Sequence, residues 1–312
     1  MILKQVLDIF DLLDRASANA AAVAAYLAAE GDCTVETRRA TGAKGGTDLI
    51  EITIAGHSGR AAGGSAPTLG VIGRLGGIGA RPDVTGFVSD GDGALTALAV
   101  AAKLARMKRL GDALSGDVVV TTHICPDAPT REHHPVPFMD SPLTQDEANA
   151  AEVLPTLDAI LSIDTTRGNR VINHGGFTIS PTVKEGYILR TSEDLLDLMT
   201  RVTGRAPCVF PLTQQDITPY GNGLYHLNSI LQPATATAAP VVGVALTTEA
   251  AVAGCASGAT QFADVEAAAR FAVEVAKAFT AGQCAFYDAG EFALIERLYG
   301  SMRHFQTSGT RA

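Results

Sequence analysis

Two short stretches of the sequence bring together residue types that bind metal ions or transfer protons. They are SDGDG, with Asp90 and Asp92, and HICPD, with His123, Cys125 and Asp127. Carboxylates and imidazoles are ligands for divalent metals, and histidine is also the commonest general base near neutral pH. The two stretches therefore predict a site for metal-assisted or acid–base chemistry.

The chain between these stretches is typical of a helix followed by a strand. An Ala/Leu-rich run predicts a helix directly after the first stretch, and the apolar residues 117–122 predict a strand that ends at His123. In α/β proteins, reactive side chains gather where strands end and helices begin. Because alternate residues of a strand share a face, the His, Cys and Asp of the second stretch would point together if the strand continued through Pro126.

The rest of the chain alternates strands with helices, which predicts an α/β three-layer sandwich with a central mixed, mostly parallel sheet. Two helices are expected near the N-terminus, followed by a hairpin over residues 33–54 and a small β insertion after the first sheet strands. The other expected elements are strands at 159–163, 171–184, 208–212 and 240–246, and helices at 143–154, 192–202 and 264–281. Since no linker or charge block interrupts the chain, residues 1–312 are interpreted as a single domain.

Composition narrows the classes of function. The 312 residues carry a formal net charge of −9, which disfavours nucleic acids and anionic membranes as partners because nothing offsets the repulsion from phosphates. The five cysteines are scattered without a CxxC pair, and the N-terminus lacks the pattern of a signal peptide. The Gly-rich run GRLGGIG has the spacing of neither common nucleotide-binding loop. These features favour a cytoplasmic protein that acts on a small molecule.

The order of the elements is more specific than any single motif. A helix pair is followed by a hairpin leading to His57, the SDGDG turn before a helix, the strand before HICPD, a strand ending at Asp164, and a late strand before a DVEAA helix. This order resembles the zinc exopeptidase superfamily, and within it the co-catalytic aminopeptidases of the tetrahedral, glutamyl-aminopeptidase type. The resemblance covers nearly the whole chain, and it implies a phosphorylase/hydrolase-like fold, a two-metal centre and a homo-oligomer.

The same resemblance implies which residues hold the metal. His57 corresponds to the first His ligand, Asp90 to the bridging Asp with Asp92 as its alternative, and Asp127 and Asp164 to terminal acid ligands. Such centres activate a shared water molecule with the help of a carboxylate base. Zinc is the expected metal, with manganese or cobalt as alternatives.

Three positions depart from the family pattern. The acid expected two residues after the first His is Gly59, the base Glu falls at Pro126, and the last His falls near Gly254. The sequence is therefore interpreted as a metal-dependent hydrolase of a small amide or peptide with an altered site. His123 and Asp92 are its candidate catalytic residues.

Two other hypotheses stay open. The absence of these three family residues is also expected for a non-catalytic small-molecule-binding or assembly protein that keeps the fold and needs no metal. Cys125 could instead act as a nucleophile with His123 or His133 as its base. Helix capping alone also explains the acidic turn, and a solvated loop explains His133 and His134.

Overall fold

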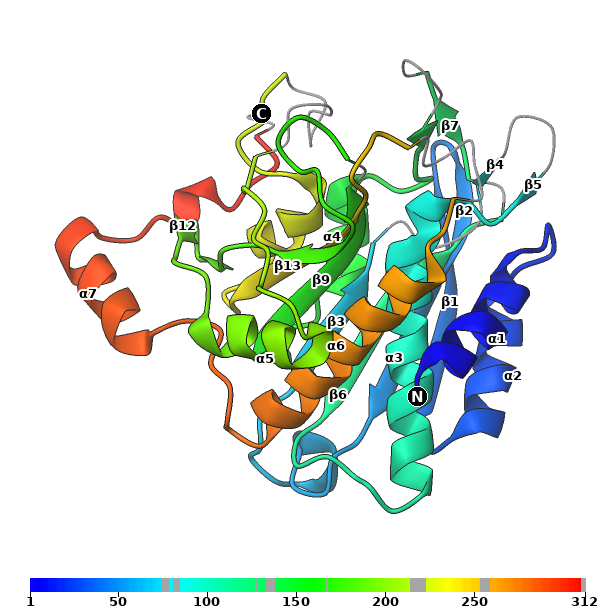
Figure 1. Cartoon of the computed structure of the whole chain (residues 1–312), viewed down its shortest axis with the longest axis horizontal. Helices are drawn as coiled ribbons and strands as arrows, with labels where there is room; N and C mark the ends of the chain where they lie inside the picture. Colours follow the sequence, from blue (N-terminus) through cyan, green and yellow to red (C-terminus); the bar gives the residue numbers. More distant parts are fainter. Residues whose placement is uncertain are drawn as a thin grey trace.

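The computed structural model describes residues 1–74, 79–80, 85–126, 128–132, 138–166, 168–213, 223–252 and 259–309. Within them, one nine-stranded sheet has the order β1-β2-β6-β3-β9-β13-β11-β12, and β10 also pairs with β13 (Figure 1). Its strands are β1 (Thr34–Gly42), β2 (Gly45–Ile54), β3 (Leu69–Gly73), β6 (Val118–Ile124), β9 (Ala159–Thr166), β10 (Gly176–Ile179), β11 (Val183–Lys184), β12 (Tyr187–Ile188) and β13 (Val241–Thr247). Two small pairs lie outside this sheet: β4 (Gly79–Ala80) with β5 (Thr85–Gly86), and β7 (Thr130–Arg131) with β8 (Phe138–Met139).

The centre of the sheet is parallel. β6, β3, β9 and β13 run in one direction, and every residue of β3, β6 and β13 is buried. Continuous apolar strands of this kind are covered on both faces, as parallel sheets require. Because the four strands are parallel, their carboxyl ends meet along one edge of the sheet, which we call the carboxyl edge. The flanking pairs β1–β2, β2–β6 and β10–β13 are antiparallel, so the sheet is mixed.

Helices cover both faces and complete the three layers. One face carries most of the apolar core and five helices: α1 (Leu3–Leu13), α2 (Ala20–Glu30), α3 (Asp92–Arg109), α5 (Glu193–Thr203) and α6 (Phe262–Thr280). The other face is covered by α4 (Gln145–Glu152) and the 3-10 helix η3 (Ser229–Thr235). Short 3-10 helices also occur at η1 (Arg60–Ala62), η2 (Ser89–Gly91) and η4 (Arg303–Phe305). The expected α/β three-layer sandwich is confirmed.

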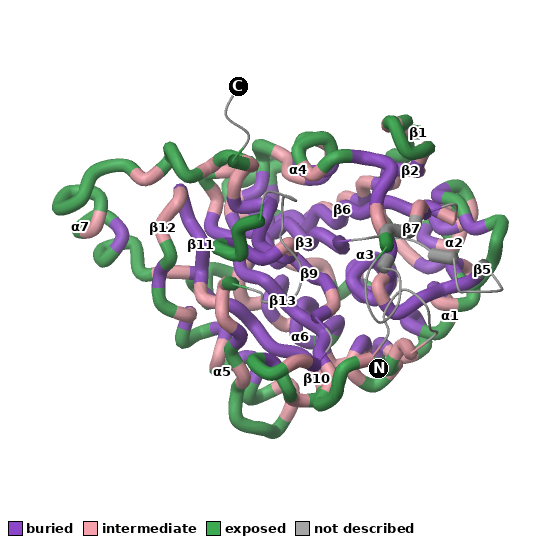
Figure 2. Tube along the Cα trace, turned by 90° about the horizontal axis from the view of Figure 1, so that it is seen from above, coloured by how far each residue is buried: buried purple, intermediate pink, exposed green. Residues whose placement is uncertain are grey.

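The last helix, α7 (Ala289–Tyr299), projects from the body of the molecule (Figure 1). Figure 2 shows buried strands at the centre and mostly exposed residues along α7. Phe292 is its only buried residue. In the described part of the chain, no helix is long and apolar enough to cross a membrane.

Candidate functional site

Three side chains at the carboxyl edge form a buried charged network. His123 is the second-last residue of β6, Arg74 directly follows β3, and Glu152 is the last residue of α4. The Nδ1 atom of His123 lies 2.8 Å from Oε1 of Glu152, and the Arg74 guanidinium lies 3.0 Å from Oε2 of the same carboxylate. The relative exposure of the three residues is 5%, 5% and 1%, so water hardly screens their charges.

Helix α4 supplies the network with a row of polar groups. Gln145, Asn149 and Glu152 are spaced i, i+4 and i+7, which places them on one side of the helix. All three accept hydrogen bonds from Arg74, the bond to Asn149 Oδ1 being 3.3 Å long. The helix begins at Thr144, which forms a capping box with Glu147. A polar stripe on a short capped helix was therefore a visible signal for this site that the sequence interpretation missed.

The network fixes the protonation state of Glu152 and the tautomer of His123. Burial alone would raise the pKa of Glu152, but the hydrogen bond from His123 and the charge of Arg74 outweigh burial and lower it. An ionised carboxylate accepts hydrogen bonds only, so Nδ1 of His123 must carry the proton. In the neutral ring Nε2 is then an acceptor, and no hydrogen bond occupies it within the described residues.

Two predicted carboxylates lie next to this network. Asp92 opens α3 and is fully buried, and its Oδ1 accepts a 2.7 Å hydrogen bond from Thr260. Asp164 in β9 is 1% exposed, and its Oδ1 accepts a hydrogen bond from the following amide. A Cβ atom on Gly93 would lie 3.1 Å from Cα of Asp164 and 2.8 Å from the carbonyl oxygen of Arg74. The first turn of α3 is thus pressed against the ends of β3 and β9.

The other predicted residue of the acidic turn, Asp90, is half-buried in η2. Its Oδ2 accepts a long hydrogen bond, 3.4 Å, from the backbone of Met139. Asp127, His133, His134 and Gly254 lie outside the described residues.

His57 does not belong to the carboxyl edge. Strand β2 is antiparallel to β6, and its last residue, Ile54, pairs with Val118 at the start of β6. His57 is exposed, and its backbone N–H donates to the carbonyl of Leu114. The length of β6, roughly 20 Å, therefore separates His57 from Asp164. The predicted grouping of His57 with the aspartates is corrected: the order of elements does not reveal the direction of β2.

The side chains of His123 and Cys125 also have different surroundings. His123 contacts Glu152, whereas the thiol of Cys125 donates to the carbonyl of Gly46 at 3.5 Å. Cys125 is 2% exposed and packs with Val88, Ala128 and Met139 in a small apolar cluster. This arrangement is typical of a buried packing cysteine.

A two-metal centre requires several His, Asp or Glu side chains that converge on the metal ions. Among the described residues, no group of three or more His, Cys, Asp or Glu side chains converges on one point. Gly93, the neighbour of Asp92, packs against Asp164, but His57 lies at the opposite edge and His123 is bound to Glu152. The described residues therefore do not fit the expected centre of two zinc ions.

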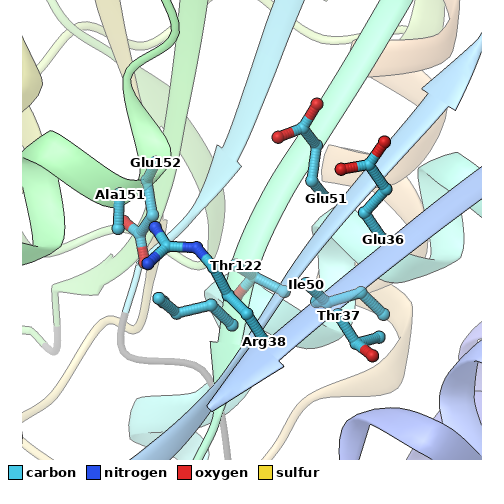
Figure 3. Close-up of a pocket in the computed structure, with 9 residues that line it drawn as sticks. Glu36, Thr37, Arg38, Ile50, Glu51, Thr122, Ala151 and Glu152 are labelled. Atoms are coloured by element: carbon cyan, nitrogen blue, oxygen red, sulfur yellow. The ribbon is translucent and has the colours of Figure 1, made fainter. Parts of the chain in front are cut away.

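A small groove lies over the β1–β2 hairpin, on the same face of the sheet as α4. It encloses about 100 Å³ and is lined by Glu36, Thr37, Arg38, Leu49, Ile50, Glu51, Thr122, Ala151 and Glu152. Figure 3 shows the carboxylates of Glu36 and Glu51 side by side, while Arg38 extends toward Ala151 and Glu152. Burial, and then the negative charge of Glu36, raise the pKa of Glu51, and Arg38 lowers it. The groove thus begins beside the buried network.

Replacing Glu51 with Gln is expected to stabilise the chain at pH 7 by at most about 1 kcal/mol, because like charges on directly opposed strand residues repel. A raised pKa means that ionisation of Glu51 weakens folding as the pH rises. The gain should therefore disappear below about pH 4, where the unfolded carboxyl is also protonated.

Thermal unfolding of E51Q and wild type at pH 7 and pH 4 measures this difference, which should amount to about 2 °C at pH 7. Glu296→Gln, at an exposed position of α7, is the matched control and should change neither temperature. A stabilisation that is equal at both pH values would contradict the explanation.

Residues 38–309 match the family described as "Protein of unknown function (DUF1177)". The chain belongs to the DUF1177 family. No curated protein matches this DUF1177 chain.

Solved structures share the fold of the DUF1177 chain at low identity. The glutaminyl cyclase of an Acidobacteriales bacterium has a TM-score of 0.53 at 11% identity, with 90% of this chain and 94% of that chain covered. The glutaminyl cyclase of Macrostomum lignano has 0.50 at 12%, covering 91% and 90%. A TET aminopeptidase from a marine sediment Thaumarchaeota archaeon has 0.50 at 10%, covering 90% and 99%. The DUF1177 chain therefore has the exopeptidase-like fold, which metal-dependent aminopeptidases and glutaminyl cyclases share.

Proposed function

We propose that the chain is a hydrolase of a small amide or peptide in which His123 is the acid–base residue. The observation that carries this proposal is the 2.8 Å contact between Nδ1 of His123 and the buried carboxylate of Glu152. A carboxylate that holds one ring nitrogen fixes the tautomer and stabilises the imidazolium, which is the arrangement that general-base catalysis uses. Arg74 keeps that carboxylate ionised and in place.

The proposed steps use only side chains of the chain itself. Nε2 of His123 takes a proton from a water molecule while the water oxygen bonds to the amide carbon. The imidazolium then gives this proton to the leaving nitrogen as the C–N bond breaks. Glu152 balances the positive charge between the two transfers without taking the proton.

Metal dependence would need donors that the described residues do not bring together. Zinc, manganese or cobalt would need Asp92 and Asp164 together with donors outside the described residues, among them Asp127. Asp92, predicted to be catalytic, is fully buried and bound by Thr260, which suits a residue that positions the start of α3. Activity should therefore be measured both after chelation and with each metal added.

The test is hydrolysis of a panel of aminoacyl p-nitroanilides and dipeptide amides by wild type and His123→Asn. The Asn side chain can still donate to Glu152, so the network stays paired while the proton acceptor is lost. We expect kcat to fall by at least about 100-fold with little change in KM, and the limb of the pH profile that reports the base to disappear.

The control is His57→Asn, the same substitution at the opposite edge of the sheet, which should leave kcat unchanged. If the two variants are equally active, His123 is not the base. If wild type hydrolyses no member of the panel with any of the three metals, the hydrolase proposal is wrong.

A non-catalytic binding protein is the second candidate, and the charged groove over the hairpin favours it. Ligand binding without turnover by wild type would support this alternative. A cytoplasmic location and a homo-oligomeric state stay predictions.

A further inference from the structure

We infer that the groove over the β1–β2 hairpin binds a small zwitterion with a primary ammonium group and a carboxylate, such as an amino acid or the end of a short peptide. This inference deepens the proposed function by naming the substrate class, and it rests on that function only for the groove's role as a substrate site. The groove is separate from the Asp92 and Asp164 pair, since its walls come from β1, β2, β6 and the end of α4.

The arrangement of side chains follows from the strand register. Glu36 pairs with Glu51 across β1 and β2, and Arg38 pairs with Leu49, so these four side chains occupy one face in two adjacent rows. Two residues of a strand on the same face are about 6.5 to 7 Å apart. The groove therefore places a pair of carboxylates one row from a guanidinium, which matches the two ends of an amino acid.

Three of the charged groups that line the groove, those of Glu36, Arg38 and Glu51, have no partner in the described part of the fold, unlike Glu152. Within the described residues, neither Glu36, Glu51 nor Arg38 forms an ion pair or a hydrogen bond. The neighbouring Arg39 behaves differently, because it points to the other face and forms a 2.8 Å ion pair with Asp48. The hairpin thus pairs its charges on one face and leaves them unpaired on the face that forms the groove.

The carboxylate pair costs stability in the free protein, since opposed like charges are unfavourable and part of Glu51 is removed from water. An ammonium group between Glu36 and Glu51 would relieve this repulsion. A ligand carboxylate would pair with Arg38, whose guanidinium has the planar geometry that carboxylates prefer. Leu49, which lies opposite Arg38, supplies an apolar surface beside the guanidinium.

The groove also leads to the proposed base. Leu49 is the register partner of His123, and Glu51 is the register partner of Thr121. Thr121 donates a 2.9 Å hydrogen bond to the carbonyl of Glu152. A zwitterion held in the groove would therefore lie one strand away from His123.

The test is an NMR titration of the full chain with three probes: L-alanine, which carries both charges, L-alaninamide, which keeps only the ammonium, and calcium chloride. We expect alanine to bind, and the double variant Glu36→Gln/Glu51→Gln to lose at least tenfold in affinity for alanine and alaninamide. Arg38→Gln should weaken alanine binding to the level of alaninamide and leave alaninamide unaffected. Glu296→Gln is the charge-matched control and should bind like wild type.

His123→Asn separates this inference from the proposed hydrolysis, because it should keep its affinity for alanine while losing turnover. Alanine binding in a chain with no hydrolytic activity would leave the zwitterion site standing and remove only the hydrolase. Absence of alanine binding, binding of calcium alone, or full affinity in the double variant would overturn the inference.

Discussion

Glu152→Leu is expected to lower the free energy of unfolding by about 3 to 5 kcal/mol, because it leaves the Arg74 guanidinium buried without its charge partner. Leucine fills a similar volume, so the loss reports the charge rather than a cavity. Urea unfolding, monitored by circular dichroism, measures this loss. The urea concentration at the midpoint should fall, while the dependence of the unfolding free energy on urea concentration stays the same.

The double variant Arg74→Met/Glu152→Leu is the decisive control for this prediction. It removes both charges and should recover most of the stability lost in E152L, so the two single effects should be strongly non-additive. If the two single effects simply add, the pair is not coupled and the explanation fails.

The pH dependence of wild type gives an independent check. The pKa of Glu152 is lowered in the folded state, so its contribution is complete above the unfolded value of about 4.3 and is lost as the pH falls further. The difference in stability between wild type and E152L should therefore shrink in acid.

Gly93→Ala is expected to lower the free energy of unfolding by about 3 kcal/mol or more. The new Cβ would lie 2.4 Å from the carbonyl oxygen of Ile163 and 2.8 Å from that of Arg74. Both atoms are backbone, so no side-chain rotation can relieve the contact and α3 must move away from β9. Thermal unfolding measures the loss, and the displacement should also lower any activity that depends on the carboxyl edge.

Gly290→Ala provides the matched control, because Gly290 is the second residue of α7 as Gly93 is of α3. Its Cβ would meet only the carboxylate of Asp288, at 3.3 Å. That variant should be neutral or slightly stabilised, since alanine favours helix over glycine. Equal stability of the two variants would show that α3 is not held against β9 by this contact.

The fold could be predicted from the sequence because its signals are local. The apolar runs of β6, β9 and β13, the alternating hairpin and the Ala/Leu helix each indicate their own structure. The expected positions of two acids also followed, since Asp164 lies in β9 and Asp92 opens α3, whose next residue, Gly93, packs against Asp164.

The site could not be predicted in the same way, because it depends on the direction of the strands and on how the helices pack against the sheet. His57 was misplaced because a hairpin strand can run in either direction relative to β6. The strand that ends beside β6 and β9 is β3, and the residue that follows it is Arg74 rather than a histidine. Glu152 was missed because a carboxylate at the end of a helix normally faces water, and only packing of α4 on the sheet buries it.

Strand β1 forms one open edge of the sheet, and its residues Glu36, Arg38 and Arg39 are exposed there. Charged residues on an edge strand prevent a second sheet from extending it, because the added strand would bury them. The side chains that we propose for ligand binding thus also protect the open outer side of a nine-residue strand from aggregation. The charges therefore disfavour an assembly that extends the sheet at β1, and selection for solubility alone would preserve part of the groove's charge.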